Sequence, residues 1–384
     1  MDRMTRHGAP YPVTPATVLL VASLIAHAVI GALAIQDAPE PQGDFDRYYE
    51  IATGSGRPYV DYQVEHPIGT LVVFKLLAAV PGGRTAFGRG VVTVNLVADI
   101  AVIAALLLVW GMPAAAFYTL VTIPIASLLF HRIDLWSMCA ATIAMAAWRR
   151  GRPSLCALSL AVGASFKLWP LVLIFALWTG GQRKRAIVIF AAAAGVAGAL
   201  ALALGGVQAV LEVLTFRGAS GWQIESTGGS LVHLLTNAAL RNESGAWRIG
   251  SVNRLTSIGL FLAAAPGCLW ASWRGLSTRR PGMAWLAAVG WLLTWSALFS
   301  AQYGAWLAPG AAIAWTEGYM SVAVLAAIVV FLTSRIMHYY GLLVASAPVL
   351  VVLVVVRNVL LIALALAALV KLRRTSLAEP DLEP

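Results

Sequence analysis

Apolar runs follow one another along nearly the whole chain, with short polar segments between them. The first run, Val13 to Ile35, is long enough to cross a bilayer at about 1.5 Å of rise per residue. It is also too long for the core of a signal peptide, so we expect a retained helix. Similar runs, such as Pro67 to Val80, recur as far as Val370. The pattern predicts an all-α polytopic membrane protein with about 12 to 14 transmembrane helices, some of them short half-helices.

Proline interrupts two of these runs. Met112 to Phe130 contains Pro124, and Pro153 to Thr179 contains Lys167 and Pro170 near its middle. We expect each run to form a hairpin of two half-helices, which is tolerated where neighbouring helices or a polar cavity satisfy the freed backbone groups. Lys167 would then lie at a hairpin tip on the outer side.

Composition and charge agree with a membrane protein. Hydrophobic residues occupy 60% of the 384 positions, charged residues 11%, and the mean hydropathy is +0.80. The net charge of +10 comes from short clusters at the ends of apolar runs: Arg3/Arg6, Arg84/Arg89, Arg149/Arg150/Arg152, Arg183/Lys184/Arg185, Arg274/Arg279/Arg280 and Lys371/Arg373/Arg374. The positive-inside rule places all of these clusters, and both termini, in the cytoplasm. Topology therefore explains the basic excess, and no nucleic-acid partner is expected.

The chain reads as a single integral membrane domain over residues 1–384. It has a first outer loop over 36–66, a second polar outer segment over 205–250 and a cytoplasmic tail over 371–384. The three cysteines lie in apolar runs without metal-ligand spacing, and no nucleotide-binding or serine-hydrolase motif occurs. We therefore expect neither a metal nor a cofactor.

The first outer loop is acidic within a basic protein. Seven of the 17 acids are in it: Asp37, Glu40, Asp44, Asp46, Glu50, Asp61 and Glu65. Tyr48, Tyr49 and Tyr59 accompany them, and carboxylates with aromatic rings suit the recognition of a sugar. A partly desolvated carboxylate could also take a proton from an attacking hydroxyl. The alternative is a solvated acidic loop without such a role.

Glu65 and His66 stand directly before Pro67, which begins the next apolar run. They could anchor the loop at the start of that helix, where unpaired amides attract a carboxylate, or they could contact the substrate.

Four cations occur inside or beside apolar runs: Arg132, Lys167, Arg335 and Arg357. A charge in hydrocarbon usually faces a protein interior, a partner or a polar cavity, so these side chains could hold a phosphate. The alternatives are snorkelling to the interface or pairing with an acid such as Asp134. Asp99, inside a run, is expected to be a structural partner.

A polar interruption follows at Phe299 to Pro309. Gln302 and Tyr303 are candidates for facing a cavity. Trp306 is expected to be an ordinary interfacial aromatic residue.

These pieces together resemble the GT-C glycosyltransferases, and within them glycosyltransferase family 87. The resemblance spans most of the chain in order, through Asp44-Phe45, Tyr48-Tyr49, Gly56 to Tyr59, Glu65 to Pro67, Phe130 to Asp134, Lys167 to Pro170, Gln302-Tyr303, Trp306 to Pro309, Tyr339-Tyr340 and Arg357-Asn358. The chain departs from the family pattern at Ile68, where a second proline is usual, and at Gln302-Tyr303, where mannosyltransferases of the phosphatidylinositol mannoside pathway have paired histidines.

The resemblance implies a GT-C type bundle in the plasma membrane, with its active site on the extracytoplasmic side. It implies a polyprenyl phosphate donor carrying mannose, a glycolipid or polysaccharide acceptor, and no nucleotide sugar. Asp44 would be the catalytic base, with Asp46 as the alternative. Lys167, Arg132 or Arg357 would hold the donor phosphate. The rival hypothesis is a membrane transporter or lipid flippase, which also uses broken helices and intramembrane charges.

Overall fold

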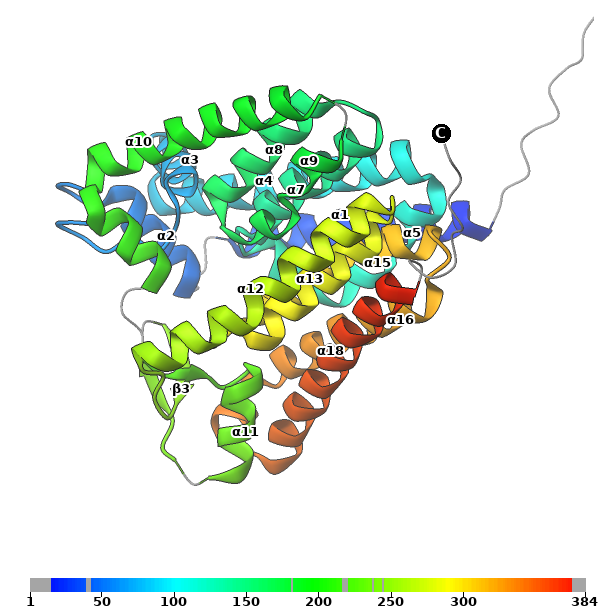
Figure 1. The fold of residues 1–384 in the computed structure, drawn as a ribbon. Helices are drawn as coiled ribbons and strands as arrows, with labels where there is room; N and C mark the ends of the chain where they lie inside the picture. The colour runs from blue at the N-terminus through cyan, green and yellow to red at the C-terminus, as the bar shows by residue number, and fades with distance from the viewer. Residues whose placement is uncertain are drawn as a thin grey trace, which may run out of the picture.

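The computed structural model describes residues 15–38, 43–180, 182–215, 220–236, 238–243 and 245–374. Over these residues the fold is almost entirely helical (Figure 1). Among the described residues, seven helical segments are long and apolar enough to cross a membrane, with Met112–Phe130 counted as one, which agrees with a multi-pass helical membrane protein. Several shorter helices pack among them, and the predicted total of about 12 to 14 crossings stays a prediction.

The amino-terminal half contains only helices among its described residues. They are α1 (Pro15–Asp37), α2 (Gly43–Thr53), α3 (Ile68–Ala78), α4 (Gly83–Trp110), α5 (Met112–Thr122), the 3₁₀ turn η1 (Ile123–Ile125), α6 (Ala126–Phe130), α7 (Asp134–Arg149), α8 (Pro153–Phe166), the 3₁₀ segment η2 (Trp169–Leu173), α9 (Ala176–Thr179) and α10 (Arg183–Thr215).

The carboxy-terminal half adds a small sheet to the helices. Its elements are β1 (Trp222–Gln223), α11 (Thr227–Leu235), β2 (Arg241–Glu243), β3 (Ala246–Ile249), α12 (Arg254–Ser277), α13 (Pro281–Trp295), α14 (Ala301–Gly304), α15 (Leu307–Thr316), α16 (Met320–His338), α17 (Tyr340–Val344) and α18 (Pro348–Arg374).

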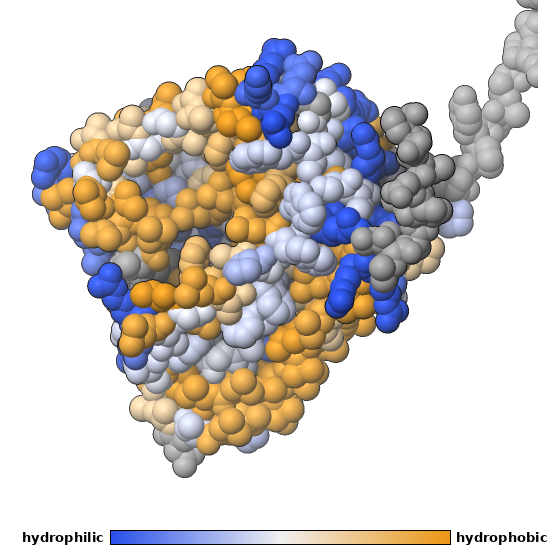
Figure 2. All heavy atoms as spheres, viewed as in Figure 1, coloured by the Kyte–Doolittle hydropathy of each residue, from blue (hydrophilic) through white to orange (hydrophobic). Residues whose placement is uncertain are grey.

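The bundle has two chemically different ends. At one end, Arg149 lies 5.9 Å from the Trp110 ring, and Arg280 and Lys371 lie 5.6 and 5.8 Å from the Tyr319 ring. We call this the basic end. The opposite end, which carries α2, Lys167 and the β-sheet, is the site end. Apolar side chains cover much of the surface over α10, α12 and α18, and polar ones gather toward the ends (Figure 2).

The run from Met112 to Phe130 is one span, so the predicted hairpin there is wrong. Contacts with α1 advance in step along both segments: Thr17 donates to Met112 Sδ, Ser23 bonds Thr119, and His27 bonds Thr122. Beyond Pro124, η1 and α6 stay packed against α1, and Asp37 at the end of α1 and His131 just after α6 line one cavity. The chain therefore keeps its direction past Pro124. It does so because a single 3₁₀ turn, η1, absorbs the proline without reversing the helix.

The run from Pro153 to Thr179 does reverse at Lys167. Past the turn, Trp169 Nε1 donates to Ser137 Oγ in the first turn of α7. Ten residues on, Thr179 accepts from Trp148 Nε1 at the other end of the same helix. The structure thus has the predicted hairpin, with Lys167 at its turn.

The segment after the first acidic loop differs from the sequence prediction. Helix α3 has 11 residues, about 16 Å of helix, which is half of what a bilayer core needs. Both of its ends bond residues of the site end, through Thr70 Oγ1 to Phe166 O and Lys75 Nζ to Gly54 O. It therefore lies across that end and does not span, contrary to prediction.

A second correction follows from the position of α3. Arg84, in the first turn of α4, forms an ion pair with Asp46 of α2. The Arg84/Arg89 cluster therefore belongs to the site end, away from the other basic clusters, because α3 returns the chain to the side from which it came.

Asp99, on α4, is a structural partner as predicted. It accepts from Tyr118 Oη at 2.8 Å and bonds His27 Nδ1 at 2.8 Å, which ties α1, α4 and α5 together.

The second polar segment, 205–250, forms the other wall of the site end. Helix α10 bends at Gly206, whose φ of 58° suits a residue without a Cβ, and runs on to Thr215. The three strands form an antiparallel sheet in the order β1-β3-β2, with Trp222 opposite Ile249 and Arg241 opposite Arg248. Helix α11 lies against the start of α18, and the sheet packs on α11 (Figure 1).

Candidate active site

A polar cavity of about 540 Å³ lies at the site end. Its walls come from α2, the 65–66 segment, the 223–225 segment, the β2–β3 turn, and the residues around α14. Nine of the twelve predicted catalytic and binding residues line it: Asp44, Asp46, Tyr48, Glu65, His66, Arg132, Lys167, Gln302 and Tyr303. Segments more than 250 residues apart thus meet at one place.

Helix α2 brings its acids to the cavity because it is amphipathic. Phe45, Tyr48 and Ile51 recur at helical spacing, are buried, and pack inward, with the Tyr48 ring 4.9 Å from Phe74. Asp44 and Asp46 stand in its first turn, where the helix dipole favours carboxylates.

Each of these two carboxylates has a cationic partner. Asp44 forms an ion pair with Arg132, which follows α6, and Asp46 pairs with Arg84. Both acids line the cavity, so the geometry alone does not choose between them.

Glu65 is anchored by an arginine side chain, and its contact with a substrate stays a prediction. Arg47 holds it through two bonds, Nε to Oε1 at 3.3 Å and Nη2 to Oε2 at 3.0 Å, and this fork fixes the end of the loop. Glu65 and His66 also line the cavity.

Lys167 is both paired and directed to the cavity. Its Nζ lies 2.8 Å from Asp134 Oδ1 and 4.9 Å from the centre of the Tyr303 ring. Asp134 is fully buried. The pairing with Asp134, which the sequence offered as an alternative to phosphate binding, is therefore present. It fixes the Lys167 ammonium at the cavity wall.

Trp306 is not an interfacial residue. It is 6% exposed, stacks on Tyr303 with ring centres 4.3 Å apart, and donates from Nε1 to Asp134 Oδ1 at 2.7 Å. The expectation was wrong because a buried carboxylate requires donors, and Trp306 supplies one of them.

Arg357 lies behind the cavity wall and does not line it. Its side chain is 1% exposed, donates from Nη2 to Glu225 O at 2.7 Å, and lies 3.9 Å from the centre of the Phe299 ring. The neighbouring Asn358 donates to Glu225 O at 3.2 Å and to Ser230 Oγ at 2.9 Å. The two residues hold the 225–230 segment against α18.

Glu225 is the residue of the site that sequence reasoning did not single out. Its carboxylate lines the cavity, accepts from Gln223 Nε2 at 3.0 Å and from Tyr340 Oη at 3.4 Å, and is 3% exposed. Burial raises the pKa of this carboxyl to about 7, although the Arg357 charge opposes the shift. Ser226, the next residue, caps α11 by accepting from Gly229 N, which fixes the end of the segment that carries Glu225.

Two predicted sugar-binding residues lie elsewhere. The Tyr49 ring packs on Phe87 with centres 5.4 Å apart. Tyr59 is buried, donates to His66 O at 2.9 Å, and lines an apolar groove of about 410 Å³ between α8 and α10. Tyr59 and Pro67 line the groove, and His66, which bonds Tyr59 and precedes Pro67, lines the polar cavity. The groove and the cavity are therefore neighbours.

Comparison with known proteins finds similar solved structures. Two of them are the crystal structures of ArnT from Cupriavidus metallidurans in the apo state and bound to undecaprenyl phosphate. The first is 15% identical over 93% of this chain and 77% of that chain, with a TM-score of 0.48. The second is 15% identical over 92% and 77%, with a TM-score of 0.44. No protein-family model and no curated protein matches. Similarity at these levels does not assign a function, which has to come from the site itself.

Proposed function

We propose that this protein is a GT-C type glycosyltransferase that moves mannose from a polyprenyl phosphate donor to a glycolipid acceptor, with inversion. One observation carries the proposal. Carboxylates of α2 and the cations Arg132 and Lys167 share a single polar cavity, and an apolar groove adjoins it. A base, a cationic cradle and a place for an isoprenoid chain are the parts such a transfer needs.

The reaction follows from these parts. Asp44 takes the proton from the acceptor hydroxyl as that oxygen forms a bond to the anomeric carbon. The bond from that carbon to the phosphate oxygen breaks, and the phosphate leaves with the electron pair. Lys167 and Arg132 stabilise the charge that grows on the leaving phosphate. Polyprenyl phosphate needs no acid to leave, so one base is sufficient.

The position of Arg357 supports a different role from the one the resemblance implies. It fixes Glu225 at the cavity wall, whereas Arg132 and Lys167 reach the cavity themselves. We therefore assign the donor phosphate to the latter two.

The active site would face the outside of the plasma membrane. Arg149, Arg280 and Lys371 gather at the basic end, which the positive-inside rule assigns to the cytoplasm. The cavity lies at the opposite end. With the Arg84/Arg89 cluster at the site end, this assignment rests on the four clusters of the described residues that lie at the basic end, and the Arg3/Arg6 cluster lies outside the described residues.

Transfer fits the cavity better than transport does. Beneath Tyr303, the rings of Trp306, Trp169 and Trp285 follow one another, with centres 5.1 and 5.6 Å apart, and Trp285 Nε1 donates to Trp306 O at 2.7 Å. Trp285 is fully buried. This tryptophan layer closes the cavity toward the basic end, where a transporter needs a path.

The test is transfer by purified protein in phosphatidylcholine nanodiscs, with radiolabelled polyprenyl phosphate mannose and a phosphatidylinositol mannoside as the glycolipid acceptor. Asp44→Asn should abolish transfer without changing the thermal midpoint. Asp61 belongs to the same loop but lines neither the polar cavity nor the apolar groove, so Asp61→Asn should retain transfer. If Asp46→Asn alone abolishes transfer, Asp46 is the base. If the wild type transfers nothing from any polyprenyl phosphate sugar, the proposed function is wrong.

A further inference from the structure

The carboxylate of Glu225 has one oxygen that is free to accept a hydrogen bond in the polar cavity. Gln223 Nε2 and Tyr340 Oη both donate to the other oxygen, Oε2, at 3.0 and 3.4 Å. No group in the described part of the chain donates to Oε1, although the side chain is only 3% exposed and lines the cavity. Buried carboxylate oxygens usually have donors, so Oε1 points to a ligand that donates.

The surrounding contacts hold this carboxylate in one place. Arg357 Nη2 donates to Glu225 O at 2.7 Å, and the next residue, Ser226, caps α11. Gln223 Nε2 also donates to Ser300 Oγ at 3.1 Å, so its nitrogen is fixed on the side that faces Glu225. An acceptor held this firmly can distinguish between ligands, because it does not move to meet a different one.

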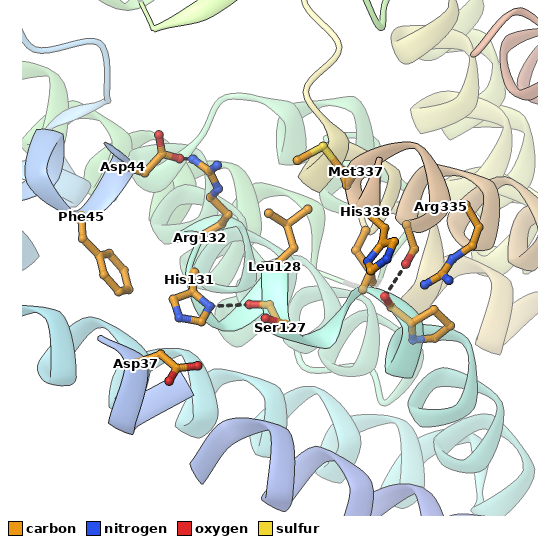
Figure 3. Close-up of a pocket in the computed structure, with 13 residues that line it drawn as sticks. Asp37, Asp44, Phe45, Ser127, Leu128, His131, Arg132, Arg335, Met337 and His338 are labelled. Carbon is orange, nitrogen blue, oxygen red and sulfur yellow. Dashed lines mark hydrogen bonds and ion pairs between the residues drawn. The ribbon is translucent and has the colours of Figure 1, made fainter. Parts of the chain in front are cut away.

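The other charges of the cavity indicate which part of a ligand lies beside Glu225. In the proposed reaction Lys167 and Arg132 hold the donor phosphate, and Arg132 pairs with the base Asp44 (Figure 3). The transferred sugar is bonded to that phosphate and has to meet the acceptor at Asp44, so it occupies the same cavity. A carboxylate repels a phosphate but accepts a hydrogen bond from a sugar hydroxyl. Glu225 therefore suits the sugar.

We propose that Glu225 Oε1 accepts a hydrogen bond from one hydroxyl group of the transferred sugar, which makes Glu225 a determinant of donor specificity. The inference rests on the proposed function and adds a sugar-binding residue to its site. A site that hydrogen-bonds a hydroxyl rejects an analogue without it, because the buried acceptor is then left unpaired. The penalty is larger when the acceptor is a carboxylate, since hydrogen bonds to charged groups are the stronger ones.

Glu225→Gln removes the free acceptor with little change of shape. Its amide oxygen stays with the Gln223 and Tyr340 donors, so its NH2 group takes the place of Oε1. The mannosyl donor should then bind about tenfold more weakly, the loss expected for one hydrogen bond to a charged group. Polyprenyl monophosphate, which has no sugar, should bind both proteins equally. Glu317→Gln is the matched control, because Glu317 lies at the basic end and does not line the cavity, and it should bind both lipids as wild type does.

The experiment measures donor binding to full-length protein in phosphatidylcholine nanodiscs without an acceptor. The pH is 8, above the Glu225 pKa of about 7, so the carboxyl is ionised. The ligands are polyprenyl phosphate mannose, its 2-, 3-, 4- and 6-deoxy forms, and polyprenyl monophosphate. One deoxy form should bind wild type about tenfold more weakly than the mannosyl donor does, and should bind Glu225→Gln as tightly as wild type. The other deoxy forms should keep the tenfold difference between the two proteins, because only the contacted hydroxyl is coupled to Glu225.

Three results would overturn the proposal: unchanged binding of the mannosyl donor by Glu225→Gln, an equal loss for polyprenyl monophosphate, or a difference between the two proteins that persists with every deoxy form. The second of these would give Glu225 a structural role only. A wild type that shows the coupling but transfers no sugar would refute the enzyme assignment and leave the sugar contact standing. A wild type that transfers mannose, with Glu225→Gln binding the donor equally well, would refute the contact and leave the enzyme assignment standing.

Discussion

Arg357 donates a hydrogen bond to the main-chain oxygen of Glu225 across 2.7 Å, and so joins a membrane helix to the wall of the cavity. The guanidinium remains buried because it lies on the Phe299 ring and because Thr333 Oγ1 accepts a further bond at 3.4 Å. From the sequence, Arg357 was a candidate for binding phosphate because it is a cation in an apolar helix. In the structure it holds the segment that carries Glu225 in place at the cavity wall.

Arg357→Lys should therefore destabilise the protein and loosen the 225–230 segment. Lysine has no planar fork and cannot meet the Glu225 oxygen and the Phe299 ring together. We expect a loss of about 1–3 kcal/mol, seen as a lower thermal midpoint and faster proteolysis near α11. Arg373→Lys, on the exposed last turn of α18, is the matched control and should behave as wild type.

The opposite result has a definite meaning. An Arg357→Lys protein with an unchanged thermal midpoint but a raised KM for polyprenyl phosphate would show that Arg357 binds the phosphate directly, as the family resemblance implies.

Much of this fold could be predicted from the sequence, because apolar length decides which segments span a membrane. The reversal at Lys167 could also be predicted, since a charge and a proline occur together there. Pro124 was misjudged because a proline alone is compatible with a single 3₁₀ turn. The position of α3 was missed because its run is apolar throughout, and only its contacts with Gly54 and Phe166 show that it stays at one end.

The site could be predicted in part. Asp44, Lys167 and Tyr303 were found because charges and rings at the ends of apolar runs are unusual. Glu225 was missed because nothing in a polar segment distinguishes a buried acid from a solvated one. Its burial depends on Asn358 and Arg357, more than 130 residues away, and such long-range contacts have no local signature.

Glu225 should make the stability of the protein depend on pH. Its carboxyl has a pKa of about 7 in the folded protein and about 4.5 when exposed, so the folded state binds the proton more tightly. The stabilising contribution is complete below about pH 4.5 and is lost as the pH rises through 7. Glu225→Gln removes this dependence. Relative to wild type, the variant should gain on the order of 3 kcal/mol between pH 5 and pH 8, measured by thermal unfolding.

Glu317 provides a matched control for this prediction. Burial also raises its pKa to about 7, but it lies at the basic end, where it accepts from Gly282 N at 3.0 Å. Glu317→Gln should shift the stability curve in the same direction. Only Glu225→Gln should also change how the KM for the donor varies with pH, because only Glu225 lines the cavity. Identical donor profiles for the two variants would contradict a role for Glu225 in the site.

Lys167 and Asp134 allow the structural and functional parts of one ion pair to be separated. Lys167→Met leaves the Asp134 carboxylate buried with Trp306 as its remaining donor, which should cost about 3–5 kcal/mol. The double variant Lys167→Met/Asp134→Asn removes both charges, and the new amide oxygen at position 134 can still accept from Trp306. Stability should therefore return in the double variant, while the KM for the polyprenyl phosphate donor stays raised because the ammonium is absent. In Asp134→Asn alone, the amide oxygen can still accept from Lys167 Nζ and the Tyr303 ring is still 4.9 Å away, so the ammonium should stay at the cavity wall and donor binding should be retained. If the double variant recovers donor binding together with its thermal midpoint, Lys167 serves only to neutralise Asp134, and the donor phosphate must be held by Arg132 without it.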